Sequence, residues 1–287
     1  RVAVNRIWQH VFGQGLVETP DNFGHMGKRP SHPALLDWLA SRLKTNNWSI
    51  KETIRDIVLS RTYRLSCSHS AKNNELDPTN NFLWRAPIKR LDAESLRDAM
   101  LHVSGELELT PPDGSVIASF NDREFNDRVH PSAEQLSSTH RSVYLPIARY
   151  WVPDMLHEFD FADPSLVVGK RTERTMASQS LFLMNSQIIT DRAMRIAKDI
   201  AAQPEEERAT AAFRKILLRD PTTSEVTMLT AFVQGLSDSS EVDVTHSTAP
   251  TSNAKSIEPE KDLNTETLEA SWQAACQTLL MTAEFRY

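Results

Sequence analysis

Apolar residues recur every three or four positions along most of this chain, which is the spacing of amphipathic helices. In the first such stretch Val4, Trp8 and Phe12 share one face and a glycine follows, so the pattern predicts a helix over 2–12. The same spacing predicts further helices over about 31–43, 49–58, 92–105, 153–159, 175–184, 187–202, 205–218 and 223–236. We expect the large aromatic residues of the first two helices, including Trp38, to lie in the core.

Capping residues mark where several of these helices begin. Ser31 can cap the second helix, and Ser49 with Glu52 has the form of a capping box. Asp92 can cap the helix that ends near Gly105. The helix after the capping box carries aliphatic residues that we expect to form its buried face: Ile50, Ile54, Ile57 and Val58.

The helical period fails after the turn signal Pro111–Gly114. Over 142–147 apolar residues alternate with others, and Pro146 suits an edge strand because it cannot donate a ladder hydrogen bond. Val116 and Ile117 are the candidate residues of a pairing strand.

These patterns predict a mainly α fold, an irregular multi-helix domain with a small central β element near 114–150. We expect one helical domain over 1–236. Residues 237–265 are rich in Ser, Thr, Asp, Glu and Pro with few large apolar side chains, so they are predicted to be a disordered insertion. Residues 266–287 are predicted to form a closing helix that packs back on the domain, with Trp272 inward.

The composition is that of a globular protein, with 40% hydrophobic and 24% charged residues. A net charge of −6 and a pI near 5.9 argue against broad nucleic-acid binding, although they leave a local basic patch open. No stretch approaches the ~20 apolar residues that a membrane span needs. Because Arg1 already stands inside a helical pattern, we expect the chain to be a fragment of a longer protein.

Cys67 and Cys276 are the only cysteines of the sequence. Two unpaired thiols and one long-range disulfide both fit this count, whereas two cysteines alone cannot complete a tetrahedral zinc site. The sequence has no Cys-x-x-Cys-His haem attachment motif, so we expect no cofactor in this chain.

Polar residues on the first helix form one candidate site. Arg6 and His10 lie four residues apart and share a face, as do Asn5 and Gln9. Arg6 offers a forked donor for a carboxylate or sulfate, and His10 titrates near neutrality, which makes it a catalytic candidate as well. The alternative is that these side chains bind neighbouring backbone or face water.

The loop Asp21–Gly27 contains two glycines and short polar side chains, so its backbone can approach a ligand closely. Asp21 and Asn22 are ligand-binding candidates on this basis. Equally, they could satisfy local amides in an ordered turn. His25 and His32 could join His10 in a metal site, but nothing in their spacing enforces convergence.

Charged residues at helical spacing form a further candidate. Glu94, Arg97 and Asp98 share one face, and Arg90 stands just before that helix. Buried, they would form a charge network that holds helices in register. In a cleft, Glu94 or Asp98 would act as a general acid or base.

The densest acidic cluster is formed by Asp154, Glu158, Asp160 and Asp163, with His157 inside it. Closely spaced oxygen ligands suit calcium, so the last three carboxylates are metal candidates. The spacing matches no EF-hand loop and the histidine lacks the partner of a zincin, so helix capping and solvated acids are the alternative. The sequence also lacks a nucleophile elbow, a Walker loop and a dinucleotide fingerprint.

The opening blocks Val4–Leu16 and Pro20–Gly24, read with Arg90–Asp98, resemble a planctomycete-type domain of unknown function, number fifteen fifty-three in that series. The resemblance continues in order through Arg141–Leu145, Phe159–Pro164, Gln179–Asn185 and Leu279–Phe285. It implies a C-terminal domain of a large periplasmic or secreted protein that often also carries a c-type cytochrome domain. Haem would then belong to a neighbouring domain, and the family supplies no established catalytic residues.

Two functions stay open at this point. The first is a non-catalytic docking module that contacts upstream domains of its own polypeptide or a partner in an extracytoplasmic complex. The second is an enzyme or binding subunit for an extracellular polysaccharide, sulfated in some forms, with Arg6, His10, Glu94 and Asp160 as its polar groups. The catalytic version requires His10, Glu94 and either Asp160 or Asp163 to converge in one pocket. We expect no nucleic-acid partner.

Overall fold

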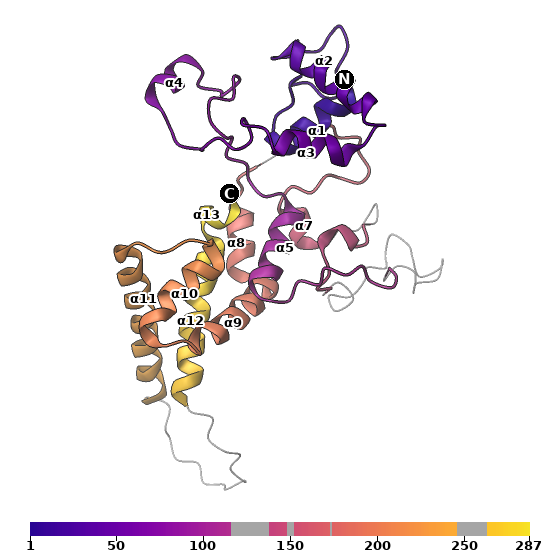
Figure 1. Ribbon diagram of the computed structural model, residues 1–287. Helices are drawn as coiled ribbons and strands as arrows, with labels where there is room; N and C mark the ends of the chain where they lie inside the picture. The colour runs from indigo at the N-terminus through magenta and orange to yellow at the C-terminus, as the bar shows by residue number, and fades with distance from the viewer. Residues whose placement is uncertain (116–137, 148–151, 173, 246–262) are drawn as a thin grey trace. The chain divides into compact units, whose positions relative to one another are not determined.

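The computed structural model describes residues 1–115, 138–147, 152–172, 174–245 and 263–287 (Figure 1). The described chain is mainly helical, as predicted, and it divides into two compact units. Unit 1 comprises Arg1–Arg90 with Leu166–Thr172, and unit 2 comprises Leu91–Ser165 with Glu173–Tyr287. The helical part expected as one domain over 1–236 is therefore shared between two units.

Unit 1 contains four helices, α1 (Val2–Phe12), α2 (Pro33–Thr45), α3 (Ile50–Val58) and α4 (Ala71–Leu76). The first three pack against one another around a single apolar cluster. Within it the rings of Trp8 and Phe12 are stacked, with centroids 4.2 Å apart. The buried members of the cluster are Val4, Trp8, Phe12, Leu16, Val17, Leu36, Leu39, Leu43 and Ile57.

A buried asparagine fixes the turn that follows α1. The Asn5 amide donates to the carbonyl of Val17 at 3.0 Å and accepts from the Val17 amide at 2.7 Å. A side chain at Gly15 would place its Cβ 2.8 Å from the side-chain nitrogen Nδ2 of Asn5. Only glycine therefore leaves room for the pairing of Asn5 with Val17. Gly13 ends α1 with a left-handed φ of 82°, as the sequence predicts.

Two expectations for unit 1 are corrected. Trp38 is not in the core, since 56% of its surface is exposed on α2. The N-cap position of α2 is held by His32, whose side chain makes no capping hydrogen bond, and not by Ser31. The amide of Ser31 instead donates to the carbonyl of Leu16. The apolar stripe Leu36, Leu39 and Leu43 already fills the inner face of α2, so Trp38 on another face stays outside.

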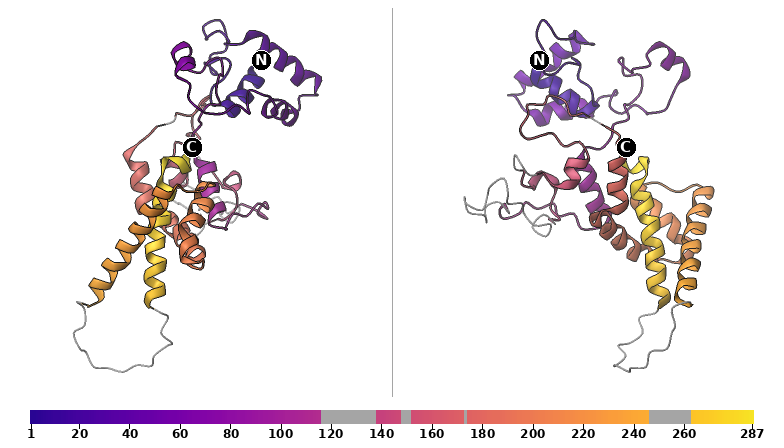
Figure 2. Two further views of the ribbon diagram at one scale, coloured as in Figure 1. Left: turned by 60° about the vertical axis from the view of Figure 1, so that its left-hand side comes forward. Right: turned by 180° about the vertical axis from the view of Figure 1, so that it is seen from behind.

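Unit 2 is built around one long helix. It contains α5 (Ala93–Val103), the 3₁₀ helix η2 (Ser142–Tyr144), α7 (Asp154–Glu158), α8 (Ala177–Asn185), α9 (Gln187–Ala201), α10 (Glu205–Leu217), α11 (Thr223–Thr245), α12 (Leu263–Met281) and α13 (Ala283–Arg286). α12 packs along α9 and α11 and also contacts α8 and α10 (Figure 2). Its buried residues Trp272, Cys276 and Leu280 lie in the main apolar cluster of this unit.

The predicted strand over 142–147 is not seen. Ser142–Tyr144 form a 3₁₀ helix instead, and the described part of this region shows only an isolated bridge between Glu108 and His140. The reason is tertiary, because Asp98 on α5 accepts bonds from both the amide and the hydroxyl of Ser142. Val116 and Ile117, the candidate partner strand, lie outside the described residues.

Both ends of the segment 237–265 are helical. α11 continues to Thr245 and α12 begins at Leu263, while 246–262 lie outside the described residues. For those residues the predicted insertion stays a prediction. The closing helix over 266–287 corresponds to most of α12 followed by α13. Among the described helices, none is both long enough and apolar enough to cross a bilayer.

Replacing Asn5 with alanine is expected to destabilise unit 1. The change leaves the amide and the carbonyl of Val17 buried without partners, which costs about 1–3 kcal/mol of unfolding free energy. Urea denaturation followed by tryptophan fluorescence measures this loss. Gln14→Ala, at an exposed position in the same turn, is the control, and an equal effect of both substitutions would contradict the role given to Asn5.

Candidate functional site

The polar stripe predicted on α1 is split between the inside and the outside of unit 1. Asn5 and Gln9 are buried, whereas Arg6 and His10 are exposed. The Gln9 amide donates to the carbonyl of Gly169 at 3.2 Å, and its oxygen is buried with no hydrogen-bond partner among the described residues. The two buried members therefore hold backbone, as the structural alternative supposed.

The loop Asp21–Gly27 is likewise held by local and long-range backbone contacts. Asp21 accepts from the amide of Gly169 at 3.1 Å, so this carboxylate anchors the segment 166–172. A Cβ at Gly169 would lie 1.9 Å from the Asp21 carboxylate, which explains the glycine there. The backbone carbonyl of Asn22 accepts from the hydroxyl of Thr19 at 2.9 Å. Asp21 is thus occupied in positioning the chain.

In unit 2, Arg97 and Asp98 form part of a half-buried polar network. Arg97 donates to the carbonyls of Ser138 and His140, and Asp98 accepts twice from Ser142 at 2.7 Å. Burial lowers the pKa of Arg97, and nearby Arg192 adds to this, while Asp98 opposes it. Glu94 lies half-buried on the same helix. The contacts of Arg97 and Asp98 hold the segment 138–142 against α5.

Sequence reasoning missed a second charge cluster next to this one. Glu106 lies 2.9 Å from the Arg192 guanidinium and 2.8 Å from that of Arg195 on α9. The side chains of Glu106 and Arg192 are only 11% and 13% exposed. Helical spacing relates residues only three or four positions apart. It therefore could not predict that Glu106 pairs with arginines more than 80 positions later.

Two members of the predicted acidic cluster, Asp160 and Asp163, follow α7 and accept hydrogen bonds from backbone amides. Asp160 accepts from the amide of Arg174 at 2.9 Å and from the side chain of Gln179 at 3.3 Å. Asp163 accepts from the amide of Ser165 at 2.7 Å, and Glu158 lies 3.9 Å from the ring of His157. In the described part of the chain no three His, Cys, Asp or Glu side chains group closely enough to hold a metal ion.

Both thiols are free in the structure. Cys276 is buried in unit 2, where burial raises the pKa of its thiol to about 12. Cys67 is exposed in unit 1. The reactive thiol of this chain is therefore Cys67.

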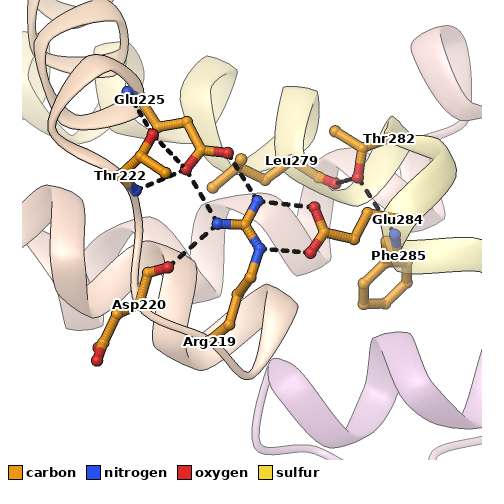
Figure 3. A network of polar contacts seen from close by, with 8 residues as sticks. All are labelled: Arg219, Asp220, Thr222, Glu225, Leu279, Thr282, Glu284 and Phe285. Carbon is orange, nitrogen blue, oxygen red and sulfur yellow. Dashed lines mark hydrogen bonds and ion pairs between the residues drawn. The ribbon is translucent and has the colours of Figure 1, made fainter. Parts of the chain in front are cut away.

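The most saturated polar group is the guanidinium of Arg219, between α10 and α11 (Figure 3). It binds Glu225 through two nitrogens at 2.7 and 3.0 Å, Glu284 at 2.8 Å and the carbonyl of Asp220 at 3.1 Å. The Arg219 hydrogen bond lowers the pKa of Glu225 to about 2 and also lowers that of Glu284. All five N–H groups are used, so the arginine clamps α13 to the start of α11 and has no donor left for a ligand.

One surface of unit 1 carries exposed apolar and basic side chains beside one another. We call it the α3 face and define it by Trp48, Ile50, Lys51, Ile54 and Arg55. The exposed fractions of Trp48, Ile50 and Ile54 are 65%, 57% and 39%, and both basic residues are exposed. On a helix, positions 50 and 54 are neighbours, as are 51 and 55, so the apolar pair and the basic pair lie side by side.

This surface corrects the predicted burial of the α3 stripe. Ile57 is buried and Val58 is half-buried, but Ile50 and Ile54 face outward. The reason is that Thr53 and Ile57 make the inward contact of this short helix, which rotates its first and fifth residues away from the core. The backbone before it is also unusual, since Asn47 and Trp48 have left-handed φ values of 50° and 59°.

Charge is distributed very unevenly between the two units. Unit 1 contains sixteen Lys and Arg and seven Asp and Glu, a net charge of +9, out of 32 and 38 in the chain. The remaining sixteen and thirty-one give unit 2 a net charge of −15, and the two add to −6. The whole-chain average hid this contrast. Counting charges over separate stretches of the sequence would have revealed it.

The acids of unit 1 are mostly engaged, which leaves many of its cations unmatched. Ion pairs join Asp37 to Arg1, Glu18 to Lys28 and Asp56 to Arg42. Across the described ranges, no carboxylate lies within ion-pair distance of a set of basic residues on or near α3: Lys51, Arg55, Arg61 and Arg64.

The residues that the catalytic hypothesis requires belong to different units. His10 belongs to unit 1, whereas Glu94, Asp160 and Asp163 belong to unit 2. The contacts given above place Asp160 and Asp163 in backbone capping. The site that the structure adds is the α3 face, which sequence reasoning had assigned to the core.

These features define a helical protein of two oppositely charged units with an exposed apolar and basic helix face. A family model, PSD1, described as a protein of unknown function (DUF1553), matches residues 1–233, so the chain belongs to this family. The matched range ends before Leu279–Phe285, the last block of the resemblance. No curated protein and no solved structure matches the chain.

Replacing Arg219 with methionine is expected to remove a stabilisation that depends on pH. The folded-state pKa of Glu225 is about 2, below its ordinary 4.5, so the clamp is fully formed above pH 4.5 and is lost as the pH falls toward 2. The difference in unfolding free energy between the native chain and Arg219→Met should therefore be largest at neutral pH and shrink in acid. Thermal denaturation across this range measures it.

The matched control for this experiment is Arg208→Met. Arg208 is a half-buried arginine of α10 that donates a hydrogen bond to the carbonyl of Gln203. Its effect should be small and independent of pH between 2 and 7. An Arg219→Met difference that stays constant with pH would show that the carboxylates do not carry the effect.

Proposed function

We propose that this chain is a non-catalytic docking module, and that it contacts its partner through the α3 face of unit 1. The observation that carries this proposal is the outward position of Trp48, Ile50 and Ile54 beside Lys51 and Arg55. Exposed apolar groups that lie next to one another are costly in water and mark surfaces that become covered.

The composition of the face supports the same function. Tryptophan and arginine are the residues that most often dominate binding energies, because they combine a large apolar area with a polar or charged group. By contrast, four of the candidate ligand-binding, metal-binding and catalytic residues accept hydrogen bonds from backbone amides: Asp21, Asp98, Asp160 and Asp163. The docking role is therefore favoured over the enzyme acting on a polysaccharide. A periplasmic or secreted location goes with it as part of the proposal.

The proposal predicts that position 54 is covered when the protein is in its native setting. In a Cys67→Ser background, Ile54→Cys should react several-fold more slowly with a maleimide in cells that produce the full-length protein than in the purified chain. Cys276 does not interfere, because its thiol is buried and its pKa is raised to about 12.

The matched control is Met228→Cys in the same background, on α11 of unit 2. Met228 is 65% exposed, so its replacement should react at similar rates in both settings. If position 54 reacts as fast in cells as in the purified chain, the α3 face stays uncovered and the docking function fails in this form.

A further inference from the structure

We propose that the surface bound by the α3 face is an anionic lipid bilayer. This rests on the proposed docking function and names the partner of the same site. Three separate properties of unit 1 point to it: the kind of apolar side chain exposed, the cations beside it that no carboxylate neutralises, and the charge of the unit as a whole.

The apolar component consists of residues suited to a bilayer interface. Trp48 stands just before α3 with 65% of its surface exposed, and Ile50 and Ile54 follow on one side of the helix. Leu59, directly after the helix, is 59% exposed. An indole ring at the headgroup level with aliphatic side chains beside it is the arrangement typical of interfacial helices. Neither a phosphate backbone nor a sugar chain has a use for the aliphatic groups.

The cations beside the apolar side chains are unmatched, although α3 also carries the exposed Glu52, and Asp56, which pairs with Arg42. Lys51 and Arg55 are neighbours on α3, and Arg61 and Arg64 follow in the next turn. As noted above, none of these four has a carboxylate within ion-pair distance in the described chain. Lys and Arg beside an apolar helix face attract the headgroups of anionic lipids.

The charges of the two units reinforce this preference. Unit 1, with a net charge of +9, is attracted to a negative surface, whereas unit 2, with −15, is repelled by it. An anionic bilayer would thus select unit 1 as the contacting part. A partner protein would need a shape that fits the face as well as complementary charge, whereas an anionic lipid surface requires only exposed cations and apolar groups.

Vesicle co-sedimentation with the full chain tests the proposal. The probes are phosphatidylcholine vesicles with about 30 % phosphatidylglycerol, and vesicles of phosphatidylcholine alone. We expect at least about tenfold tighter binding to the anionic vesicles, weakened when NaCl rises from about 0.1 M to about 0.5 M. Lys51→Gln/Arg55→Gln should lose about tenfold in binding, and Ile50→Ser/Ile54→Ser should also bind more weakly.

Matched controls come from unit 2. Lys198→Gln/Arg208→Gln removes one exposed and one half-buried cation, and Met228→Ser/Phe232→Ser removes two exposed apolar side chains four residues apart on α11. Both should bind as the native chain does. All substituted residues except the half-buried Arg208 are exposed, and far-ultraviolet circular dichroism confirms that each variant folds.

Several results would overturn the lipid proposal. They are equal binding to both vesicle types, losses of the same size in the unit 2 controls, or tighter binding to dextran sulfate or to a single-stranded oligonucleotide than to the anionic vesicles. Failure here with a slowed maleimide reaction at position 54 would reject the lipid while the docking function stands. Failure of both would reject the docking function as well.

Discussion

The apolar cluster around α12 holds unit 2 together, and the guanidinium of Arg219 fixes how two of its segments meet. It joins Glu225 in the first turn of α11 to Glu284 in α13, and so ties two segments that are far apart in sequence. α13 in turn accepts a hydrogen bond, through the carbonyl of Arg286, from the amide of Leu91 at 2.8 Å. The C-terminal helix α13 thereby also holds Leu91, the first residue of unit 2. Single exposed ion pairs contribute little to stability. Here one forked donor binds two carboxylates and so connects α11, α13 and the loop after α10.

Helices were predictable here because their signal is local. The stops at Gly13 and Gly105 and the caps at Ser49 and Asp92 appear in the structure where the residues placed them. The capping side chains act on amides only three positions away, so a short window of sequence contains the whole interaction.

What the sequence could not supply were contacts between distant segments. Ser142 is drawn into a 3₁₀ turn by Asp98, 44 positions earlier, so the local alternation that predicted a strand was overruled. The bond from Gln9 to Gly169 spans 160 positions. Periodicity also shows that a helix has an apolar face without showing that anything covers it. This is why Ile54 was assigned to the core and is found outside.

The opposite charges of the two units change what the average properties of the chain mean. A pI near 5.9 describes a protein that should behave as a mild acid, yet neither unit does. In ion-exchange chromatography at neutral pH, the resin binds local patches of surface charge and does not respond to the net charge alone. The same molecule can be retained by an anion exchanger through unit 2 and by a cation exchanger through unit 1. The isoelectric point is therefore a poor guide to what this protein adheres to.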